Sequence, residues 1–174
     1  AFKTNFHLNE RVEEIKKVKK KWVIKTNKGT EFEASSIIIA AGVGSFESRK
    51  FPTKEIEKYE GKQILYSIKD KKIFKDKRVA IFGGGDSALD WAIELSNISK
   101  VALVHRRDEF RGMQASIDRV NQLKNEGKIE VHTKYQLDSV KGNEKVESIN
   151  IKHENESIKE IKTDYVLGFF GLIM

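Results

Sequence analysis

The amino-acid sequence predicts an α/β fold of three layers, with a parallel sheet and an antiparallel β excursion that leaves it. Two short apolar runs, residues 79–82 and 101–104, have the length and composition of buried strands. Between them, apolar residues recur at the spacing of one helix face, namely Ala88, Leu89, Ala92, Ile93 and Leu95. Strand, helix and strand in this order are typical of a unit that builds a parallel sheet.

The composition bounds the class of protein. The 174 residues include 39% hydrophobic residues and one proline, which favours one folded domain, or one domain with part of another, over a disordered chain. The 33 basic and 26 acidic residues give a net charge of +7, which would suit an anionic partner. The charges are spread along the chain, however, so they favour an ordinary solvated surface, and we expect no nucleic-acid partner.

Two absences narrow the chemistry. The sequence has no cysteine, which excludes disulfides, thiolate metal sites and cysteine nucleophiles among these residues and is compatible with the cytoplasm. No apolar segment approaches the roughly 18 residues needed to span a bilayer, and the N-terminal segment resembles neither a signal peptide nor a transit peptide. We therefore expect a cytoplasmic protein with no membrane partner.

The first part of the chain predicts β structure. Residues 11–34 alternate apolar and charged side chains over three short runs, with a turn at Gly29, which is typical of an antiparallel meander. The lysines at 19–21 fit a solvated sheet edge better than an anionic docking patch. Residues 35–44 hold three consecutive isoleucines followed by small residues, which predicts a strand buried on both faces and ending in a glycine turn.

A connection between domains is expected next. Residues 45–78 mix charged and aromatic side chains around Pro52 and contain no chemistry that can be named from the sequence. We place a domain boundary near residue 50. The division that follows is residues 1–50, residues 51–170 and a short end at residues 171–174.

A glycine-rich turn follows the first apolar run. Gly83, Gly85 and Ala88 satisfy the pattern G-x-G-x-x-G/A where strand gives way to helix. Gly83 permits the tight turn, Gly85 lets a diphosphate approach the backbone, and the small Ala88 lets the helix pack on the strand. The start of the helix adds free amides and a positive dipole end. The motif therefore predicts a Rossmann-like dinucleotide-binding domain.

Asp86 and Ser87 stand at the start of that helix. Either side chain can cap the helix by accepting hydrogen bonds from its unpaired amides. Asp86 has a second interpretation as a catalytic acid, but a carboxylate beside the expected diphosphate fits capping better. We therefore predict that these side chains cap the helix.

The second apolar run ends in His105, Arg106 and Arg107. An NAD site would have an acidic residue about 20 positions past the glycines to bind the ribose hydroxyls. Arg106 lies 21 positions past Gly85 and offers a fork suited to a 2'-phosphate. The arginines therefore predict NADP, with a preference over NAD of about two to four powers of ten. The alternative is that they are solvated and that Asp108 binds the ribose.

Residues 113–127 predict an amphipathic helix that stops at Gly127. Its apolar face is formed by Met113, Ile117, Val120 and Leu123. A partner-binding helix is one interpretation of this face, but packing into the core fits better.

The last third of the chain predicts more strands. Residues 129–163 predict an antiparallel excursion off the parallel sheet, and residues 165–169 predict a return to it. His132 and His153 lack the spacing of metal ligands, so we expect both to be exposed strand residues and predict no metal site.

The segments described above resemble a known family. GGGDSALDWA and VHRRDEFR closely resemble the NADPH domain of two-dinucleotide-domain flavoproteins of the thioredoxin-reductase type, and within them the bacterial ferredoxin (or flavodoxin)–NADP reductases. In thioredoxin reductases a redox Cys-x-x-Cys lies upstream of the glycine loop. The matching residues 65–70 hold no thiol. Because disulfide exchange requires a thiolate, the resemblance favours the ferredoxin–NADP reductases, and residues 66–70 are expected to be a structural strand and turn.

The resemblance implies which residues hold the cofactors. Residues 51–170 would be the NADP-binding domain, and residues 1–50 would be part of an FAD-binding domain in which Ala41 and Gly42 approach the flavin. The NADP(H) site would be formed on the diphosphate side by Gly83, Gly84, Gly85, Asp86, Ser87 and Ala88, and around the 2'-phosphate by His105, Arg106, Arg107 and Arg111.

The resemblance also implies a reaction. In the complete enzyme a hydride would pass between nicotinamide and flavin, and single electrons would pass from the flavin to ferredoxin or flavodoxin, with no catalytic acid or base. The family's glycine-rich FAD loop and its Gly-Asp flavin motif are not found in this sequence. We therefore expect a piece of a longer, homodimeric flavoprotein that is inactive alone. We expect residues 37–39 to expose apolar surface or to find a partner chain. Domain rotation about residues 45–52 and 168–171 is implied.

Two other functions stay open. One is a non-catalytic NADP-binding module, such as a sensor or regulatory domain. The other is a thioredoxin-reductase-like flavoprotein that lacks the redox Cys-x-x-Cys in this stretch.

Overall fold

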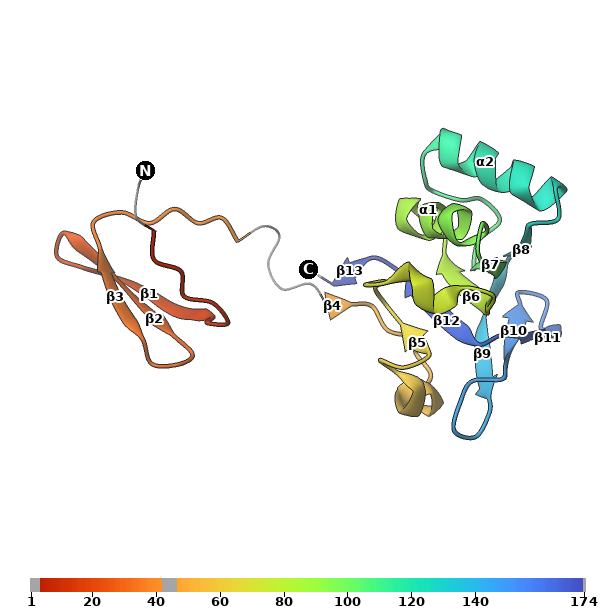
Figure 1. The fold of residues 1–174 in the computed structure, drawn as a ribbon, viewed down its shortest axis with the longest axis horizontal. Helices are drawn as coiled ribbons and strands as arrows, with labels where there is room; N and C mark the ends of the chain where they lie inside the picture. Colours follow the sequence, from red (N-terminus) through yellow and green to blue (C-terminus); the bar gives the residue numbers. More distant parts are fainter. Residues whose placement is uncertain (1–3, 42–46, 174) are drawn as a thin grey trace. The chain divides into compact units, whose positions relative to one another are not determined.

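The computed structural model describes residues 4–41 and 47–173. The chain divides into two compact units, residues 1–44 and residues 45–174, which are drawn in Figure 1. Each unit has sheets of its own and is described by itself. The boundary near residue 50, and the assignment of the two parts to flavin and to NADP, remain predictions.

The first unit is an antiparallel meander of β1 (Val12–Val18), β2 (Lys21–Thr26) and β3 (Glu31–Ala34). The central strand is β2, on which Ile24 lies opposite Phe32 of β3. Apolar side chains on one face of a strand recur every second residue, which is why the alternation in the sequence marks these strands. The predicted meander is confirmed.

The strand predicted in residues 35–44 does not form in the part of this segment that the structure describes, residues 35–41. Ile38 and Ile39 are 92% and 76% exposed. A strand needs a neighbour for its backbone N–H and C=O groups, and no segment among the described residues pairs with this one. The buried strand is therefore a wrong prediction, whereas the expected exposure of apolar surface at this place is confirmed.

The second unit is built on a parallel sheet in the order β5-β12-β6-β7-β8. The strands are β5 (Ile64–Leu65), β6 (Arg78–Gly83), β7 (Lys100–His105), β8 (Ile129–Thr133) and β12 (Tyr165–Phe169). All four neighbouring pairs are parallel, so the carboxyl ends of β6, β7 and β12 meet at one edge of the sheet. The predicted parallel sheet and the return of the chain to it are confirmed.

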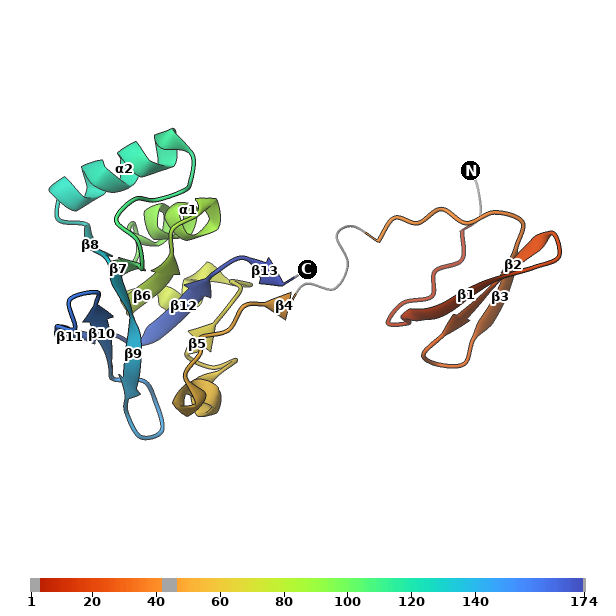
Figure 2. The same ribbon diagram turned by 180° about the vertical axis from the view of Figure 1, so that it is seen from behind.

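The two faces of this sheet are covered by different layers, because alternate residues of a strand point to opposite faces. Ile81 of β6 packs in the core beneath α1 (Asp86–Leu95) and α2 (Gln114–Asn125). Its neighbours Ala80 and Phe82 pack in a second core with residues of the antiparallel strands. Figures 1 and 2 show α1 and α2 together on one side of the sheet and the antiparallel strands away from them. The unit therefore has the three layers predicted.

The third layer is an antiparallel sheet of β9 (Tyr135–Lys141), β10 (Ser148–His153) and β11 (Ile158–Lys162), with β10 in the centre. The predicted excursion is confirmed, but it begins later than predicted, because residues 129–133 are the parallel edge strand β8. The chain turns out of the parallel sheet at Lys134, whose φ is 63°. A single residue in the left-handed region ends one strand and starts the next, and hydrophobic periodicity cannot reveal it.

Helix α2 packs as predicted over most of its length. Val120 and Leu123 are buried, and Ile117 packs against the core. Met113, which we expect on the same face, precedes the helix and is 69% exposed, so that part of the prediction is wrong. The helix ends at Asn125, close to the predicted stop at Gly127. No helix in the described ranges is both long and apolar enough to cross a membrane.

His132 is buried, with 8% of its surface exposed, so the prediction of an exposed strand residue is wrong. Its ring meets Tyr135 edge-on, with the ring centroids 5.8 Å apart. Burial is the main cause that lowers the pKa of His132. Its Nε2 makes no hydrogen bond of acceptable geometry within the described residues, although Oε2 of Glu130 lies 3.4 Å away.

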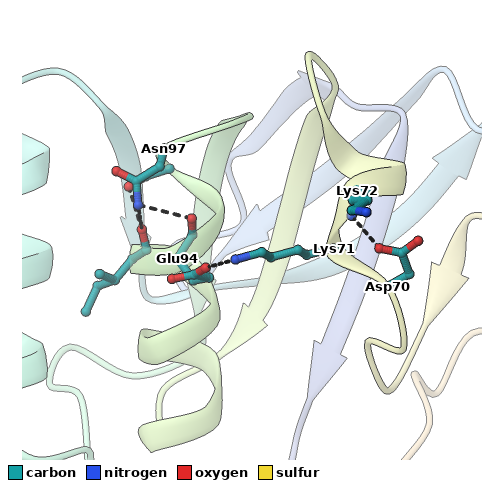
Figure 3. A network of polar contacts seen from close by, with 7 residues as sticks. Asp70, Lys71, Lys72, Glu94 and Asn97 are labelled. Atoms are coloured by element: carbon teal, nitrogen blue, oxygen red, sulfur yellow. Dashed lines mark hydrogen bonds and ion pairs between the residues drawn. The ribbon is translucent and has the colours of Figure 1, made fainter.

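A short 3-10 helix, η2 (Lys71–Phe74), fixes the segment before β6. Figure 3 shows that Lys71 of η2 forms an ion pair with Glu94 of α1. Oδ1 of Asp70 accepts a hydrogen bond from the N–H of Lys72 at 2.9 Å and so caps the start of η2. Both partners of the ion pair are about half exposed, so it adds little stability, and its effect is to orient η2 against the helix.

The segments that enter and leave the second unit run beside each other. The short strands β4 (Glu47–Ser48) and β13 (Leu172–Ile173) pair antiparallel. They lie at or beside the two connections expected at residues 45–52 and 168–171. Rotation about these connections stays a prediction.

We predict that Ile81→Ala destabilises the second unit by about 2–5 kcal/mol, because Ile81 is fully buried in the centre of β6 and its loss leaves a cavity. Urea unfolding of the chain measures this change. The matched control is Ile158→Ala on β11, where the side chain is 60% exposed and the expected loss is within about 0.5 kcal/mol. Equal losses for the two variants would contradict the core assignment.

Candidate functional site

The turn between β6 and α1 is closely packed. Gly83 has a φ of 154°, and a Cβ atom placed on it would lie 2.6 Å from the carbonyl oxygen of Phe169 and 2.7 Å from Cβ of Ala88. Ala88 is itself fully buried. Neither position therefore has room for a larger side chain, and the tight approach of α1 to β6 and β12 depends on both residues.

Gly84 and Gly85 differ in what surrounds them. A Cβ atom on Gly84 would lie 2.5 Å from Nε2 of His105, so the histidine ring fills the space on that side of the loop. A Cβ atom on Gly85 would meet nothing within 4 Å. The loop is thus supported at Gly84 and open at Gly85, where the motif predicts that a diphosphate approaches the backbone.

His105 is buried under the loop, with 8% of its surface exposed. Its Nε2 lies 3.1 Å from the carbonyl oxygen of Glu109, and its ring stacks on Phe110 with the centroids 5.3 Å apart. Burial lowers the pKa of His105, the hydrogen bond to Glu109 opposes this, and the charges of Arg106 and Arg111 lower it further. The ring therefore supports the glycine loop, while its predicted contact with a 2'-phosphate stays a prediction.

Three arginines gather around the same loop. Arg106 and Arg111 are exposed and Arg107 is half-buried. The backbone N–H of Arg111 donates to the carbonyl oxygen of Gly84 at 2.6 Å, which ties this residue to the loop rather than to the first turn of α2. Within residues 4–41 and 47–173, none of the ion pairs involves any of the three guanidinium groups. The end of β7 thus presents concentrated positive charge.

The predicted capping of α1 is wrong. The N-cap residue is Gly85, and no side chain caps the helix. Oδ1 of Asp86 instead accepts a hydrogen bond from the N–H of Met113 at 2.6 Å, so it holds the segment before α2. Ser87 is exposed. The first N–H groups of a helix have no partner inside it, so without a side-chain cap they remain donors for an anion at the loop.

A cavity of about 480 Å³ lies at the carboxyl ends of β6, β7 and β12. This size is within the range of small-molecule sites. It brings together Gly83, Gly84, Gly85, His105 and the three arginines. The remaining lining residues are Arg49, Lys50, Phe51, Pro52, Phe82, Val104, Tyr135, Gln136, Leu137, Phe169, Phe170 and Gly171.

Several of these residues were not found from the sequence. Phe51 meets the rings of Phe82 and Phe170 edge-on, with centroid distances of 5.1 and 4.7 Å, and forms an aromatic wall. Tyr135 lines the cavity from β9. Phe51, Tyr135 and Phe170 lie far from the glycine motif along the chain, and the fold brings them to the edge of the sheet where the motif lies. The aromatic residues beside Pro52 and Gly171 were the available signal.

Tyr66 lies in the stretch where the thioredoxin reductases would carry a thiol. Its hydroxyl donates to Oε1 of Glu60 at 2.7 Å and accepts a hydrogen bond from the N–H of Phe51 at 3.3 Å. Burial and the neighbouring carboxylate raise the pKa of Tyr66. The hydroxyl therefore ties the start of the unit to η1 (Lys54–Tyr59) and the residue that follows it, so the role of Tyr66 is structural. The strand expected at residues 66–70 is wrong, because β5 ends at Leu65.

Three other features bear on ligands. Of the two residues expected to approach a flavin, Ala41 is exposed in the first unit and Gly42 lies outside the described residues. A larger hollow of about 570 Å³ lies at the amino ends of β6 and β7, away from the glycine loop. No group of three or more His, Asp or Glu side chains suited to a metal occurs among the described residues.

The residues around the smaller cavity fit a phosphorylated dinucleotide. The loop is open at Gly85 and adjoins the uncapped start of α1, so it can accept a diphosphate. Arginine guanidinium groups without carboxylate partners suit a further phosphate. The cavity is also lined by the aromatic rings of Phe51 and Phe170, which suit a ring system.

Comparison with known proteins agrees with this geometry. The family model described as pyridine nucleotide-disulphide oxidoreductase matches residues 1–171. A protein named ferredoxin–NADP reductase from Pelagibacter ubique (strain HTCC1062) is 64% identical over 173 residues, which are 99% of this chain and 51% of that protein. One of the same name from Flavobacterium psychrophilum is 48% identical over 174 residues, which are 98% of this chain and 49% of that protein. The chain thus spans about half the length of the curated relatives it matches.

Solved structures give the same fold. A thioredoxin reductase from Lactococcus lactis matches with a TM-score of 0.80 at 26% sequence identity. The match covers 94% of this chain and 53% of the Lactococcus lactis chain. The thioredoxin reductase from T. acidophilum matches with a TM-score of 0.81 at 27% sequence identity, and the match covers 94% of this chain and 53% of the T. acidophilum chain. The Rossmann-like class predicted from the glycine motif is confirmed.

We predict that Gly84→Ala destabilises the second unit by about 1–3 kcal/mol, because the added Cβ atom meets the buried His105 ring. Urea unfolding checks the loss. The double variant Gly84→Ala/His105→Ser removes the ring and should recover part of the stability. If the double variant were less stable than either single variant, the contact would not explain the glycine.

We also predict that acid weakens the second unit. Burial lowers the pKa of His105 and of His132, so the folded state favours the neutral rings. Histidine in an unfolded chain titrates near pH 6.5, so the stabilisation is complete above about pH 6.5 and is lost as the pH falls toward the folded values. Urea unfolding should need less denaturant at about pH 5.5 than at about pH 7.5. His132→Leu should reduce the difference in stability between these two pH values. If the free energy of unfolding of the parent chain were the same at both pH values, the prediction would be refuted.

Proposed function

Because this chain belongs to the pyridine nucleotide-disulphide oxidoreductase family, we propose that its second unit binds NADP(H) for an FAD-dependent oxidoreductase. In the complete protein, electrons pass between NADPH and ferredoxin or flavodoxin by way of the flavin. The names of the relatives at 64% and 48% identity support ferredoxin as the acceptor. A homodimer in the cytoplasm is part of the same proposal.

The diphosphate of NADP(H) binds at the start of α1. Gly85 leaves the backbone open there, and Gly84 is held in place by the ring of His105. Asp86 and Ser87 contribute their backbone N–H groups rather than their side chains, because no side chain caps the helix. Gly83 and Ala88 let β6 and α1 approach closely enough to form this loop.

The 2'-phosphate binds among Arg106, Arg107 and Arg111. The observation that carries the proposal is that these three guanidinium groups surround one cavity, while no ion pair of the described residues engages them. A phosphate dianion supplies the missing negative charge, and bidentate pairing with a guanidinium favours it over a ribose hydroxyl. The nucleotide is therefore NADP(H) rather than NAD(H).

The chain's own contribution to the reaction is binding and orientation. When bound, the nicotinamide supplies or accepts a hydride and the flavin takes part in electron transfer. The rings of Phe51 and Phe170 give one side of the cavity an apolar surface. In the first unit, Ala41 and Gly42 are proposed to approach the flavin. No side chain acts as a catalytic acid or base.

Ferredoxin–NADP reductase chemistry is favoured over disulfide reduction. Residues 65–70 hold no thiol, and Tyr66 in that stretch is engaged with Glu60 and Phe51. The relatives named ferredoxin–NADP reductase are 64% and 48% identical, whereas the matched structures named thioredoxin reductase are 26% and 27% identical.

We predict that Arg106→Ala/Arg107→Ala lowers the preference for NADPH over NADH by about one to two powers of ten. The loss is smaller than for buried pairs, because Arg106 is exposed and Arg107 is half-buried, so solvent screens the contacts. Calorimetric titration of the chain with NADPH and with NADH measures both dissociation constants. A parent chain without a preference for NADPH would rule out the proposed site.

The matched control is Gly85→Ala. Its Cβ atom meets nothing in the protein, so the fold should be retained, but it stands where the diphosphate approaches. Since NADPH and NADH share the diphosphate, both should weaken to a similar extent. If Arg106→Ala/Arg107→Ala weakened the binding of NADPH and of NADH by the same factor, the arginines would not select the 2'-phosphate.

A further inference from the structure

We propose that Lys134 is a positioning residue that sets the nucleotide preference, by holding Asp108 away from the ribose position and fixing the backbone of Arg107. This inference rests on the proposed binding of NADP(H). It concerns a residue outside both the glycine motif and the arginine cluster.

The first observation is the backbone at the end of β8. Lys134 has a φ of 63°, at the point where the chain leaves the parallel sheet. Its N–H donates to the carbonyl oxygen of Arg107 at 3.1 Å, and its own carbonyl oxygen accepts from the N–H of Glu154 at 3.0 Å. Both backbone polar groups of Lys134 are thus hydrogen-bonded. The bond to Arg107 holds the segment that follows β7.

The second observation is the ammonium group. Nζ of Lys134 lies 3.3 Å from Oδ2 of Asp108 and 3.1 Å from Oε1 of Glu154. The lysine side chain is 33% exposed, which makes it the most shielded member of the group. The hydrogen bonds that the ammonium group donates to Glu154 and to Asp108 raise the pKa of Lys134, so the group stays charged at neutral pH.

These contacts matter because of where Asp108 stands. It directly follows the two arginines, in the region where an NAD site uses an acidic residue to bind the ribose hydroxyls. A carboxylate at that position would also repel a 2'-phosphate. The cavity is lined by Arg106 and Arg107 but not by Asp108, whose carboxylate is turned to Lys134.

The test compares ligands that differ only in the 2'-phosphate. The chain is titrated with 2',5'-ADP and with AMP, and the ratio of the two affinities is the readout. Lys134→Gln removes both ion pairs and leaves the backbone donor in place, with no new demand on φ. We expect the ratio to fall about two- to fivefold, the range of partly exposed ion pairs, mainly through weaker binding of 2',5'-ADP.

Three further variants separate the possible roles of Lys134. Lys134→Arg keeps the positive charge and should retain the parent ratio. Glu154→Gln removes the other carboxylate and should also leave the ratio unchanged. Lys134→Gln/Asp108→Asn should restore most of the ratio, because the carboxylate that Lys134 restrains is then gone.

Each outcome decides the inference. If the double variant keeps the low ratio, Lys134 contacts the phosphate itself and the positioning role is refuted. If Lys134→Gln weakens both ligands equally or changes neither, the residue does not determine specificity. If the parent chain shows no preference for 2',5'-ADP, the proposed NADP(H) site fails first, independently of Lys134.

Discussion

The packing at Gly83 and Gly84 is the constraint on which the second unit depends. At Gly83, the ends of β6 and β12 and the first turn of α1 come so close that a Cβ atom would be within 2.7 Å of both Ala88 and Phe169. At Gly84 the ring of His105 closes the other side. Because these contacts join three strands and a helix, the position of the helix N-terminus follows from them. The loop is open at Gly85, because no protein atom lies within 4 Å of the place where a Cβ atom would be.

Charge is distributed in a similar way, with several lysines and glutamates paired and the arginines at the end of β7 left without carboxylate partners among the described residues. Most of the lysines and glutamates that form ion pairs do so on the surface of strands and loops, as in Lys21 with Glu33 on the meander. Such exposed pairs contribute little to stability but leave no unbalanced charge. At the end of β7 the arginines have no such partners among the described residues, while Asp108 and Lys134 pair with each other beside them. The acidic residue that would balance the arginines is therefore engaged elsewhere.

Local patterns predicted the elements but not the contacts between them. The alternation in residues 11–34, the glycine motif and the helical face at Ala88 and Leu89 each depend on neighbours a few positions away, and all three are confirmed. The turn at Lys134, the burial of His132 and the use of Asp86 to hold Met113 depend on partners distant in the sequence. The isoleucines at 37–39 show the converse, since a strongly apolar run forms a strand only if another strand is present to pair with it.

We propose that one scaffold can serve different redox chemistries, because the nucleotide site proposed above and the stretch before β6 lie on different elements. The glycine loop, α1 and the end of β7 form the proposed nucleotide site, and they belong to the fold shared with the matched structures named thioredoxin reductase at TM-scores of 0.80 and 0.81. The stretch before β6, residues 65–70, holds no thiol. There Tyr66 bonds to Glu60 and Phe51, so the segment packs against the aromatic wall of the cavity. These contacts involve no residue of the glycine loop or the arginine cluster, so the absence of a thiol from this stretch does not alter the packing of either.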